Sequence, residues 1–399
     1  MNGHASAYSN VFRRRPTATA VFSPLTQQPV VHRRTRTMAL RTQYGSVSLD
    51  VVHGQDPKDK HWGCPIREQW RLSDHQQLSF AFQDKLAFTA TATGSYADAA
   101  ALAEKWGAPV SPSLVHALVQ SLGEKAEEAT QQRLKAPPKE THPQRPASQL
   151  GVLMMDGWIV RQRGPGWGKK KTKETRTEWR EWKTGVYFPL EQAVRTKGDR
   201  GMLTGKRVMG WQGEPVEFGA RLHAEAMRAG LGRARKQLVV GDGAAWIWNL
   251  AKARWPEAEQ VLDFYHASQH LWELGKALQG ENEAKIRAWV EPRRSQLRRG
   301  GQKNVLEEIA ALKCRDDASG TVVKREQEYF AGHEHRMGYR TTHRKGWPIG
   351  SGAVESACRQ RQCRFKRPGQ FWTATGMRNL GALTEARHNL HWEELWSAP

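Results

Sequence analysis

Three acidic residues stand out because the sequence around each of them is apolar or rich in glycine. Asp156 and Asp242 each end an apolar run and precede a glycine. A strand that is buried on both faces excludes a charged side chain unless the charge is paired or bound to a metal. Glu355 follows a short segment of serine and glycine that is typical of a helix start.

Carboxylates distributed in this way are suited to holding divalent cations. Mg²⁺ prefers oxygen ligands, and two such ions held about 3.5–4 Å apart draw their ligands from several elements of a fold. The ion pair activates a water molecule or a 3′-hydroxyl and stabilises the oxygen that leaves phosphorus. We therefore expect Asp156, Asp242 and Glu355 to be catalytic and to bind two Mg²⁺ or Mn²⁺ ions. For Glu355 alone, an ordinary solvated helix is the alternative.

The elements that must position these acids alternate in type. Their patterns predict strands at 151–160, 179–188 and 206–211, a helix at 217–230, a strand at 237–241, a helix at 244–254, and a strand at 259–264 that leads into another helix. This order fits an α/β fold with an RNase H-like sheet and flanking helices. Residues 150–275 and 341–396 are expected to form this catalytic domain, and the charged stretch 276–340 is expected to be a helical insertion.

The N-terminal part is expected to be separate from the catalytic domain. Residues 1–41 carry arginines and no acid, and we interpret them as a basic, disordered arm. Residues 42–130 are interpreted as a small helical domain, in which Ser95 and Ser111 cap two successive helices. This helix pair resembles a helix-turn-helix, with a plain helical hairpin as the alternative. The proline-containing stretch 131–149 is interpreted as a linker.

The composition points to a polyanionic partner. Lys and Arg number 62 against 40 Asp and Glu, and the formal charge is +22. Such a surface attracts nucleic acid, because neutralising phosphates releases counterions. No apolar run of about 18 residues is present, so no segment is expected to span a membrane. We expect a cytoplasmic, nucleoid-associated protein that contacts DNA through basic residues near the acids. These are Arg161, Arg163, Lys169, Lys170, Lys171, Arg359 and Lys366.

Five short stretches, taken in order, resemble DDE transposases. They read MMDGW around Asp156, EWREWKTGVYF after it, VVGDGAAWIW around Asp242, DFYHASQHLW around Asp263, and PIGSGAVES around Glu355. The set is most similar to the ISKra family of bacterial insertion sequences, within the Mutator-like group. The resemblance covers roughly residues 40–396 and implies that Asp156, Asp242 and Glu355 are the DDE triad.

The resemblance also includes an acid, two further residues and a histidine, which Asp263 and His266 match. It implies an auxiliary role for these two residues at the site, and purely structural support by His266 is the alternative. A zinc site is a further alternative, since His266 and His270 are one helical turn apart with Asp263 nearby.

The function implied by the resemblance is that of a DNA transposase encoded by a mobile element. Such an enzyme cleaves DNA strands at the terminal inverted repeats of its insertion sequence and joins them to target DNA. Because strands are cut and rejoined, this DNA transposition is a form of DNA recombination. The expected partners are those repeats, target DNA, and further copies of the chain in a dimer or higher oligomer. The alternatives are a non-catalytic DNA-binding protein derived from a transposase, and an RNase H-like nuclease that never joins strands.

Overall fold

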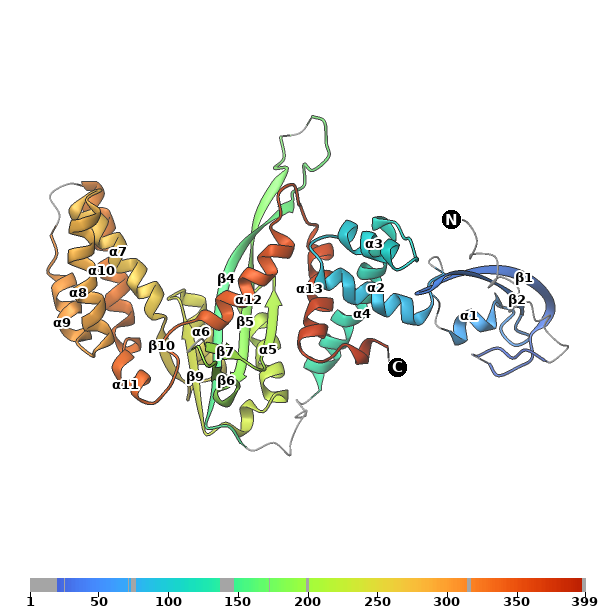
Figure 1. The fold of residues 1–399 in the computed structure, drawn as a ribbon, viewed down its shortest axis with the longest axis horizontal. Coiled ribbons are helices and arrows are strands. Elements are labelled where there is room, and N and C mark those ends of the chain that lie inside the picture. The colour runs from blue at the N-terminus through green and yellow to red at the C-terminus, as the bar shows by residue number, and fades with distance from the viewer. Residues whose placement is uncertain are drawn as a thin grey trace. The chain divides into compact units, whose positions relative to one another are not determined.

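The computed structural model comprises two compact units, residues 1–124 and 125–399 (Figure 1). The described residues are 20–24, 26–70, 72, 77–136, 147–171, 173–198, 201–313 and 317–396. No helix within these ranges is long and apolar enough to cross a membrane.

The first unit begins with a curved antiparallel pair of strands, β1 (Val31–Thr42) and β2 (Gly45–Gln55), to which the short strand β3 (Trp62–Gly63) is added (Figure 1). Helix α1 (Pro65–Gln69) follows. A small core unites these elements. Its buried members are Met38, Leu40, Val51, Cys64 and Leu72.

This sheet corrects two of the predictions for the N-terminal part. The disordered arm predicted for residues 1–41 is wrong for residues 31–41, which belong to β1, and residues 1–19 lie outside the described part. The small helical domain predicted over residues 42–130 has its helices, but the prediction did not include the strands β2 and β3. The arginine-rich first half of β1 concealed the strand, because the apolar residues that alternate toward the core begin at Met38.

The predicted helix pair is present in the first unit. Ser95 caps α3 (Tyr96–Lys105) by accepting a hydrogen bond from the Asp98 amide at 3.0 Å. Before it lies α2 (Phe80–Ala92), and after it α4 (Pro112–Lys135), which contains the boundary between the units. The linker predicted for residues 131–149 is wrong at its start, since α4 continues to Lys135, and residues 137–146 lie outside the described part.

The second unit is built on a five-stranded mixed sheet. In chain order the elements are β4 (Leu150–Arg163), β5 (Thr177–Pro189), β8 (Arg207–Trp211), α5 (Pro215–Arg228), β9 (Lys236–Gly241), α6 (Ala245–Arg254) and β10 (Glu259–Leu262). The strand order is β10-β9-β4-β5-β8. β4 pairs in parallel with β9 and antiparallel with β5. This succession is the predicted one, and the α/β class is confirmed.

Several short elements join this framework and were not predicted. They are η1 (Leu190–Gln192), β6 (Ala193–Arg195), β7 (Gly201–Leu203), η2 (Leu231–Arg233), η3 (Glu334–Arg336) and η4 (Glu393–Leu395). β6 and β7 form a two-stranded sheet between β5 and β8 in the chain.

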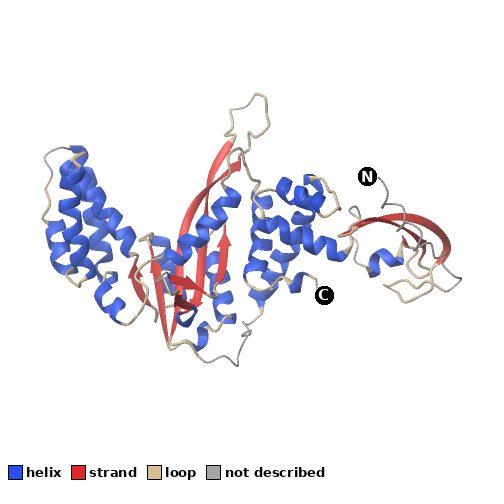
Figure 2. Ribbon diagram, in the orientation of Figure 1, coloured by secondary structure: helices blue, strands red, loops and turns tan. Residues whose placement is uncertain are grey.

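Beyond β10 the chain is helical. The helices are α7 (Phe264–Gln279), α8 (Glu283–Arg298), α9 (Gln302–Ala310), α10 (Asp317–His333), α11 (Tyr339–Arg344), α12 (Gly352–Phe365) and α13 (Ala374–His388). Helices α7 to α11 form a group beside the β10 edge of the sheet (Figure 2). The predicted insertion is therefore helical, but its start at residue 276 falls inside α7, which runs unbroken from the end of β10.

Helices cover both faces of the central strands. Gly185 on β5 faces α5, since a Cβ placed there would lie 2.6 Å from a methyl of Leu222. The preceding residue, Thr184, points to the opposite face. That face carries α12, whose Phe365 packs with Trp158 and Trp182 of the sheet. Burial on both faces explains why the residues of β4 from Leu150 to Met155 are apolar and buried.

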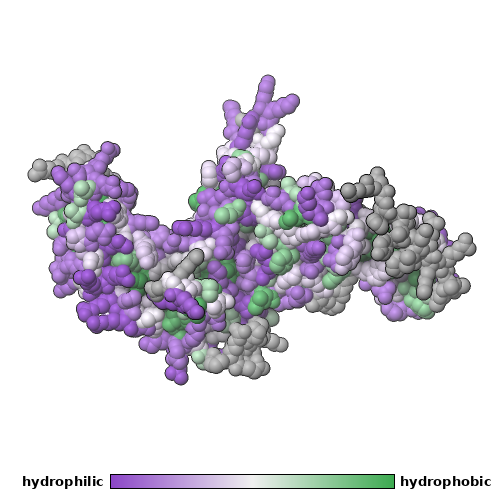
Figure 3. Space-filling view, viewed as in Figure 1, coloured by the Kyte–Doolittle hydropathy of each residue, from purple (hydrophilic) through white to green (hydrophobic). Residues whose placement is uncertain are grey.

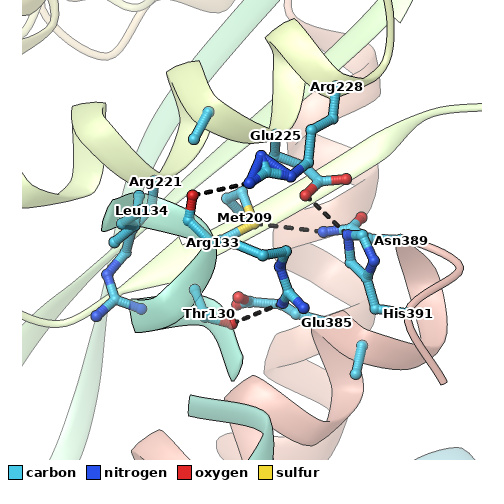
Figure 4. Close-up of a pocket in the computed structure, with 12 residues that line it drawn as sticks. Thr130, Arg133, Leu134, Met209, Arg221, Glu225, Arg228, Glu385, Asn389 and His391 are labelled. Carbon is cyan, nitrogen blue, oxygen red and sulfur yellow. Dashed lines mark hydrogen bonds and ion pairs between the residues drawn. The ribbon is translucent and has the colours of Figure 1, made fainter. Parts of the chain in front are cut away.

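An ionic network joins α5 to α4 and to the segment that follows α13, and Figure 4 shows the part of it around Glu225 and His391. Arg221 pairs with Glu127 at 2.6 Å, and Glu225 contacts His391 Nε2 at 2.9 Å. Burial alone would lower the pKa of His391, but the hydrogen bonds to Glu225 and then to Glu394 outweigh it and raise this pKa. The network is therefore one of paired charges, which is the form in which buried charges are stable.

Candidate active site

The two aspartates of the predicted triad lie close to where the neighbouring parallel strands β4 and β9 part: Asp156 is in the middle of β4, and Asp242 directly follows β9. The ladder between β4 and β9 ends with Met154 opposite Val240. Asp156 lies two residues further along β4, and Asp242 lies two residues beyond Val240, directly after β9 ends at Gly241. The two carboxylates are close enough for the charge of Asp242 to raise the pKa of Asp156. The structure thus brings these two acids together, as the sequence predicted.

The electrostatics of Asp156 agree with this proximity. Burial raises the pKa of Asp156, a hydrogen bond from the Cys358 thiol opposes the rise, and the Asp242 carboxylate raises the pKa further. The charge of His266 acts in the opposite direction on the same pKa. Asp156 is therefore a half-buried carboxyl group within electrostatic reach of a second carboxylate and of the predicted auxiliary histidine.

Glu355 reaches the same region from α12. Its Oε1 accepts a hydrogen bond from Ser351 Oγ at 3.0 Å. One turn further along α12, Cys358 is buried and bonded to Asp156, so this face of the helix is turned toward the middle of β4. Glu355 is half-buried and lies in the first turn of α12, as predicted from the serine and glycines before it.

Asp263 has a structural role that the sequence motif did not specify. It is fully buried, follows β10 and lies level with Asp242, because Leu262 pairs with Gly241. One carboxylate oxygen accepts hydrogen bonds from the amides of Tyr265 and His266, which caps α7, and the other accepts from the Ser351 amide. Asp263 thus ties the start of α7 to the segment that leads into α12.

The zinc alternative does not fit the side-chain directions. His270 Nδ1 contacts Glu326 at 2.5 Å, and its ring stacks on Tyr329 with centroids 3.6 Å apart. Both oxygens of Asp263 are engaged by backbone amides. His270 and Asp263 therefore face different partners.

Among the described residues, Asp156, Asp242 and Glu355 form no ion pair with a lysine or arginine, although the chain carries 62 such residues. No group of three or more His, Cys, Asp or Glu side chains in the described ranges is arranged closely enough to hold a metal ion. The donor set itself suits a hard divalent cation, since it consists of carboxylate oxygens whose mutual repulsion a cation relieves.

Tyr329, which the sequence did not point to, and the glycine noted after Asp242 together shape the Asp242 turn. Tyr329 of α10 donates a hydrogen bond from Oη to the Asp242 carbonyl at 2.9 Å. Gly243 has φ +113°, and a Cβ placed there would lie 2.7 Å from Tyr329 Cε2. The glycine after Asp242 was a visible signal of a special turn. No sequence signal pointed to Tyr329, since it lies on α10, which is far from Asp242 in the chain.

The predicted DNA-binding residues fall into two groups. Five of them lie at the end of β4 and in the loop that joins it to β5, whose tip is hydrophilic (Figure 3). Arg161 lies over the Phe371 ring at 4.9 Å and Arg163 over the Trp167 ring at 5.3 Å. Lys169 pairs with Glu174. The other two predicted lysines, Lys170 and Lys171, are exposed, and so are Arg359 and Lys366 on and just after α12.

Comparisons with known proteins give little to set beside this geometry. No family model matches the chain, and no curated protein matches it. Among solved structures, the chain is similar to the one titled "Drosophila P element transposase strand transfer complex", with 10% identity over 83% of this chain and 85% of that one, and a TM-score of 0.27. A score of that size is too low to establish a common fold.

Proposed function

We propose that this chain is a DNA transposase of the bacterial DDE type, resembling the ISKra family, with an RNase H-like catalytic sheet. One observation carries the proposal. Asp156 on β4 and Asp242 directly after the parallel strand β9 lie within electrostatic reach of each other, with Glu355 on the covering helix, and none of the three forms an ion pair with a lysine or arginine in the described part. Carboxylates left unpaired in so basic a chain are best explained by a cation that joins them when bound.

In this proposal each of the three acids supplies oxygen ligands. Two bound Mg²⁺ or Mn²⁺ ions would activate the attacking oxygen and stabilise the leaving one. The chain's own residues set the geometry. Tyr329 fixes the Asp242 backbone, and Asp263 holds the start of the segment that carries Glu355. Asp263 is thus a positioning residue, and His266 lies near Asp156.

The basic loop between β4 and β5 is proposed to grip the phosphate backbone of the DNA. Arg161 and Arg163 are held against aromatic rings at the end of β4, which limits the conformational freedom lost on binding. These contacts carry no sequence information by themselves. They would position the strand to be cut at the acids.

Cleavage of DNA that flanks the gene of this protein tests the proposal. Purified protein with Mg²⁺ or Mn²⁺ is expected to nick such fragments and to join them to a target plasmid. Asp156→Ala, Asp242→Ala and Glu355→Ala are expected to remove both activities while DNA binding persists. The matched control is Glu257→Gln, which neutralises an exposed carboxylate with no ion pair in the described ranges.

Each outcome has a defined meaning. Normal cutting by any of the three alanine variants contradicts the assignment of the triad. Binding without metal-dependent cutting by the wild type indicates a non-catalytic DNA-binding protein. Cutting without joined products indicates a nuclease.

A further inference from the structure

A groove lined by arginines lies between α8 and α11, beside the start of α7. Its volume is roughly 750 Å³. We call it the arginine groove. Its defining residues are Arg294, Arg298, Arg299, Arg340 and Arg344, with Phe264 at its inner end. None of these arginines was among the DNA contacts that the sequence predicted.

The charges of the groove are largely unbalanced. Arg294 pairs with Glu291 at 3.3 Å. Within the described residues, Arg298, Arg299, Arg340 and Arg344 form no ion pair, and all four are exposed. Gathering like charges in one concave surface costs energy, and it raises the local concentration of a polyanion. The guanidinium group is also the side chain that best matches phosphate oxygens, because its forked N–H groups bind two of them at once.

The groove is adjacent to the candidate active site, because its lining residue Phe264 is next in the chain to Asp263. Phe264 follows Asp263 directly, and its amide donates a hydrogen bond to the Ile349 carbonyl at 2.9 Å. Ile349 lies in the segment that leads to Ser351 and Glu355. Arg294 lies over the Phe264 ring at 5.7 Å. A single backbone junction therefore connects the inner end of the groove to the segments that carry the acids.

We propose that the arginine groove binds the phosphodiester backbone of duplex DNA that extends from the cleavage site. This inference rests on the proposed function for its choice of ligand, since the groove chemistry itself is phosphate recognition. In this inference, the helical segment α7 to α11 holds the duplex while the acids act on one of its phosphodiester bonds. The face of this segment seen in Figure 3 is mostly hydrophilic, as expected of a surface that meets a phosphate backbone.

The test removes the four unpaired charges together. The variant carries Arg298→Gln, Arg299→Gln, Arg340→Gln and Arg344→Gln. The matched control removes four exposed charges of the same segment outside the groove, through Lys285→Gln, Arg287→Gln, Lys303→Gln and Lys313→Gln. Binding of a fluorescent duplex to the full chain is measured by anisotropy over a range of salt concentrations, and folding is checked by circular dichroism.

The groove variant is expected to lose at least tenfold in duplex affinity relative to the control. Its slope of log affinity against log salt is expected to be shallower by about 0.9 for each phosphate that the variant no longer neutralises. Equal affinities and slopes for the two variants would overturn the inference. A second titration, with inorganic phosphate and with ATP as competitors, separates the two sources of phosphate. Tight ATP binding that the groove variant loses, with duplex affinity unchanged, would also overturn it.

Failure of the proposed function gives a different pattern. If the wild type binds duplex through the groove but never cuts it, the inference stands and the transposase assignment does not. If the wild type cuts and the groove variant cuts equally well at equal affinity, the assignment stands and the inference fails.

Discussion

Replacing Asp156 with asparagine is expected to stabilise the protein while it destroys catalysis. Burial and the Asp242 carboxylate raise the pKa of Asp156. When folding raises the pKa of an acid, the contribution of that acid to the free energy of unfolding is most favourable below its unfolded pKa. This contribution is lost as the pH rises through the folded pKa. Above the folded pKa the folded state therefore bears the cost of the charge. The substitution Asp156→Asn removes that cost and retains the shape of the side chain.

The expected gain in the free energy of unfolding is on the order of 0.5–1 kcal/mol in the absence of divalent metal, the lower part of the range seen for single stabilising substitutions. For a unit of this size it corresponds to a rise of roughly 1–4 °C in Tm. Loss of one anionic ligand is expected to slow strand cleavage by on the order of 10³-fold, equivalent to about 4 kcal/mol in the transition state.

Two assays test these signs. Thermal melting of the full chain is followed in EDTA at pH 7 and again with Mg²⁺, for the wild type, Asp156→Asn and the control Glu257→Gln. Mg²⁺ is expected to raise the Tm of the wild type and of the control, because a ligand that binds the folded state stabilises it, and to have less effect on Asp156→Asn. Cleavage is measured on the same preparations. A variant that melts lower than the wild type in EDTA, or that cuts within tenfold of it, refutes the reasoning.

Three further perturbations test the supporting structure. Tyr329→Phe removes the hydrogen bond to the Asp242 carbonyl and is expected to lower the free energy of unfolding by about 1 kcal/mol. Cleavage is expected to slow by roughly tenfold or less. An unchanged cleavage rate and an unchanged Tm would contradict the positioning role of Tyr329. Gly243→Ala would place a Cβ at φ +113° and 2.7 Å from Tyr329 Cε2. The free energy of unfolding, measured with denaturant, is therefore expected to fall by about 2 kcal/mol or more. The raised pKa of His391 means that its pairing with Glu225 stabilises the fold fully below pH 6.5 and is lost as pH rises through the folded pKa. Glu225→Gln should therefore narrow the difference in Tm between pH 6 and pH 8, and an unaltered difference would argue against the pair.

The sequence was most informative where one residue type conflicts with its surroundings. Apolar runs predicted the strands that precede the two aspartates, and the structure has Asp156 within β4 and Asp242 directly after the neighbouring strand β9. The serine and glycines before Glu355 predicted the start of α12. These signals are local, because strand burial, turn glycines and helix starts depend on a few adjacent residues.

The sequence was misleading where composition outweighed pattern. The arginines of residues 31–36 suggested disorder, yet they form the exposed first half of β1, and the buried positions begin at Met38. A strand with one solvated face tolerates charges on that face, so charge alone does not distinguish it from a flexible arm.

The sequence by itself determined the types and order of the elements around the acids, since hydrophobic periodicity and turn residues depend only on residues that are close in the chain. Tertiary structure decided which side chains meet. Cys358 bonds to Asp156, Tyr329 holds the turn at Asp242, and the arginines of α8 and α11 face one groove. Those pairs join residues far apart in the chain, and their contact depends on how helices pack on a sheet, which no local pattern encodes.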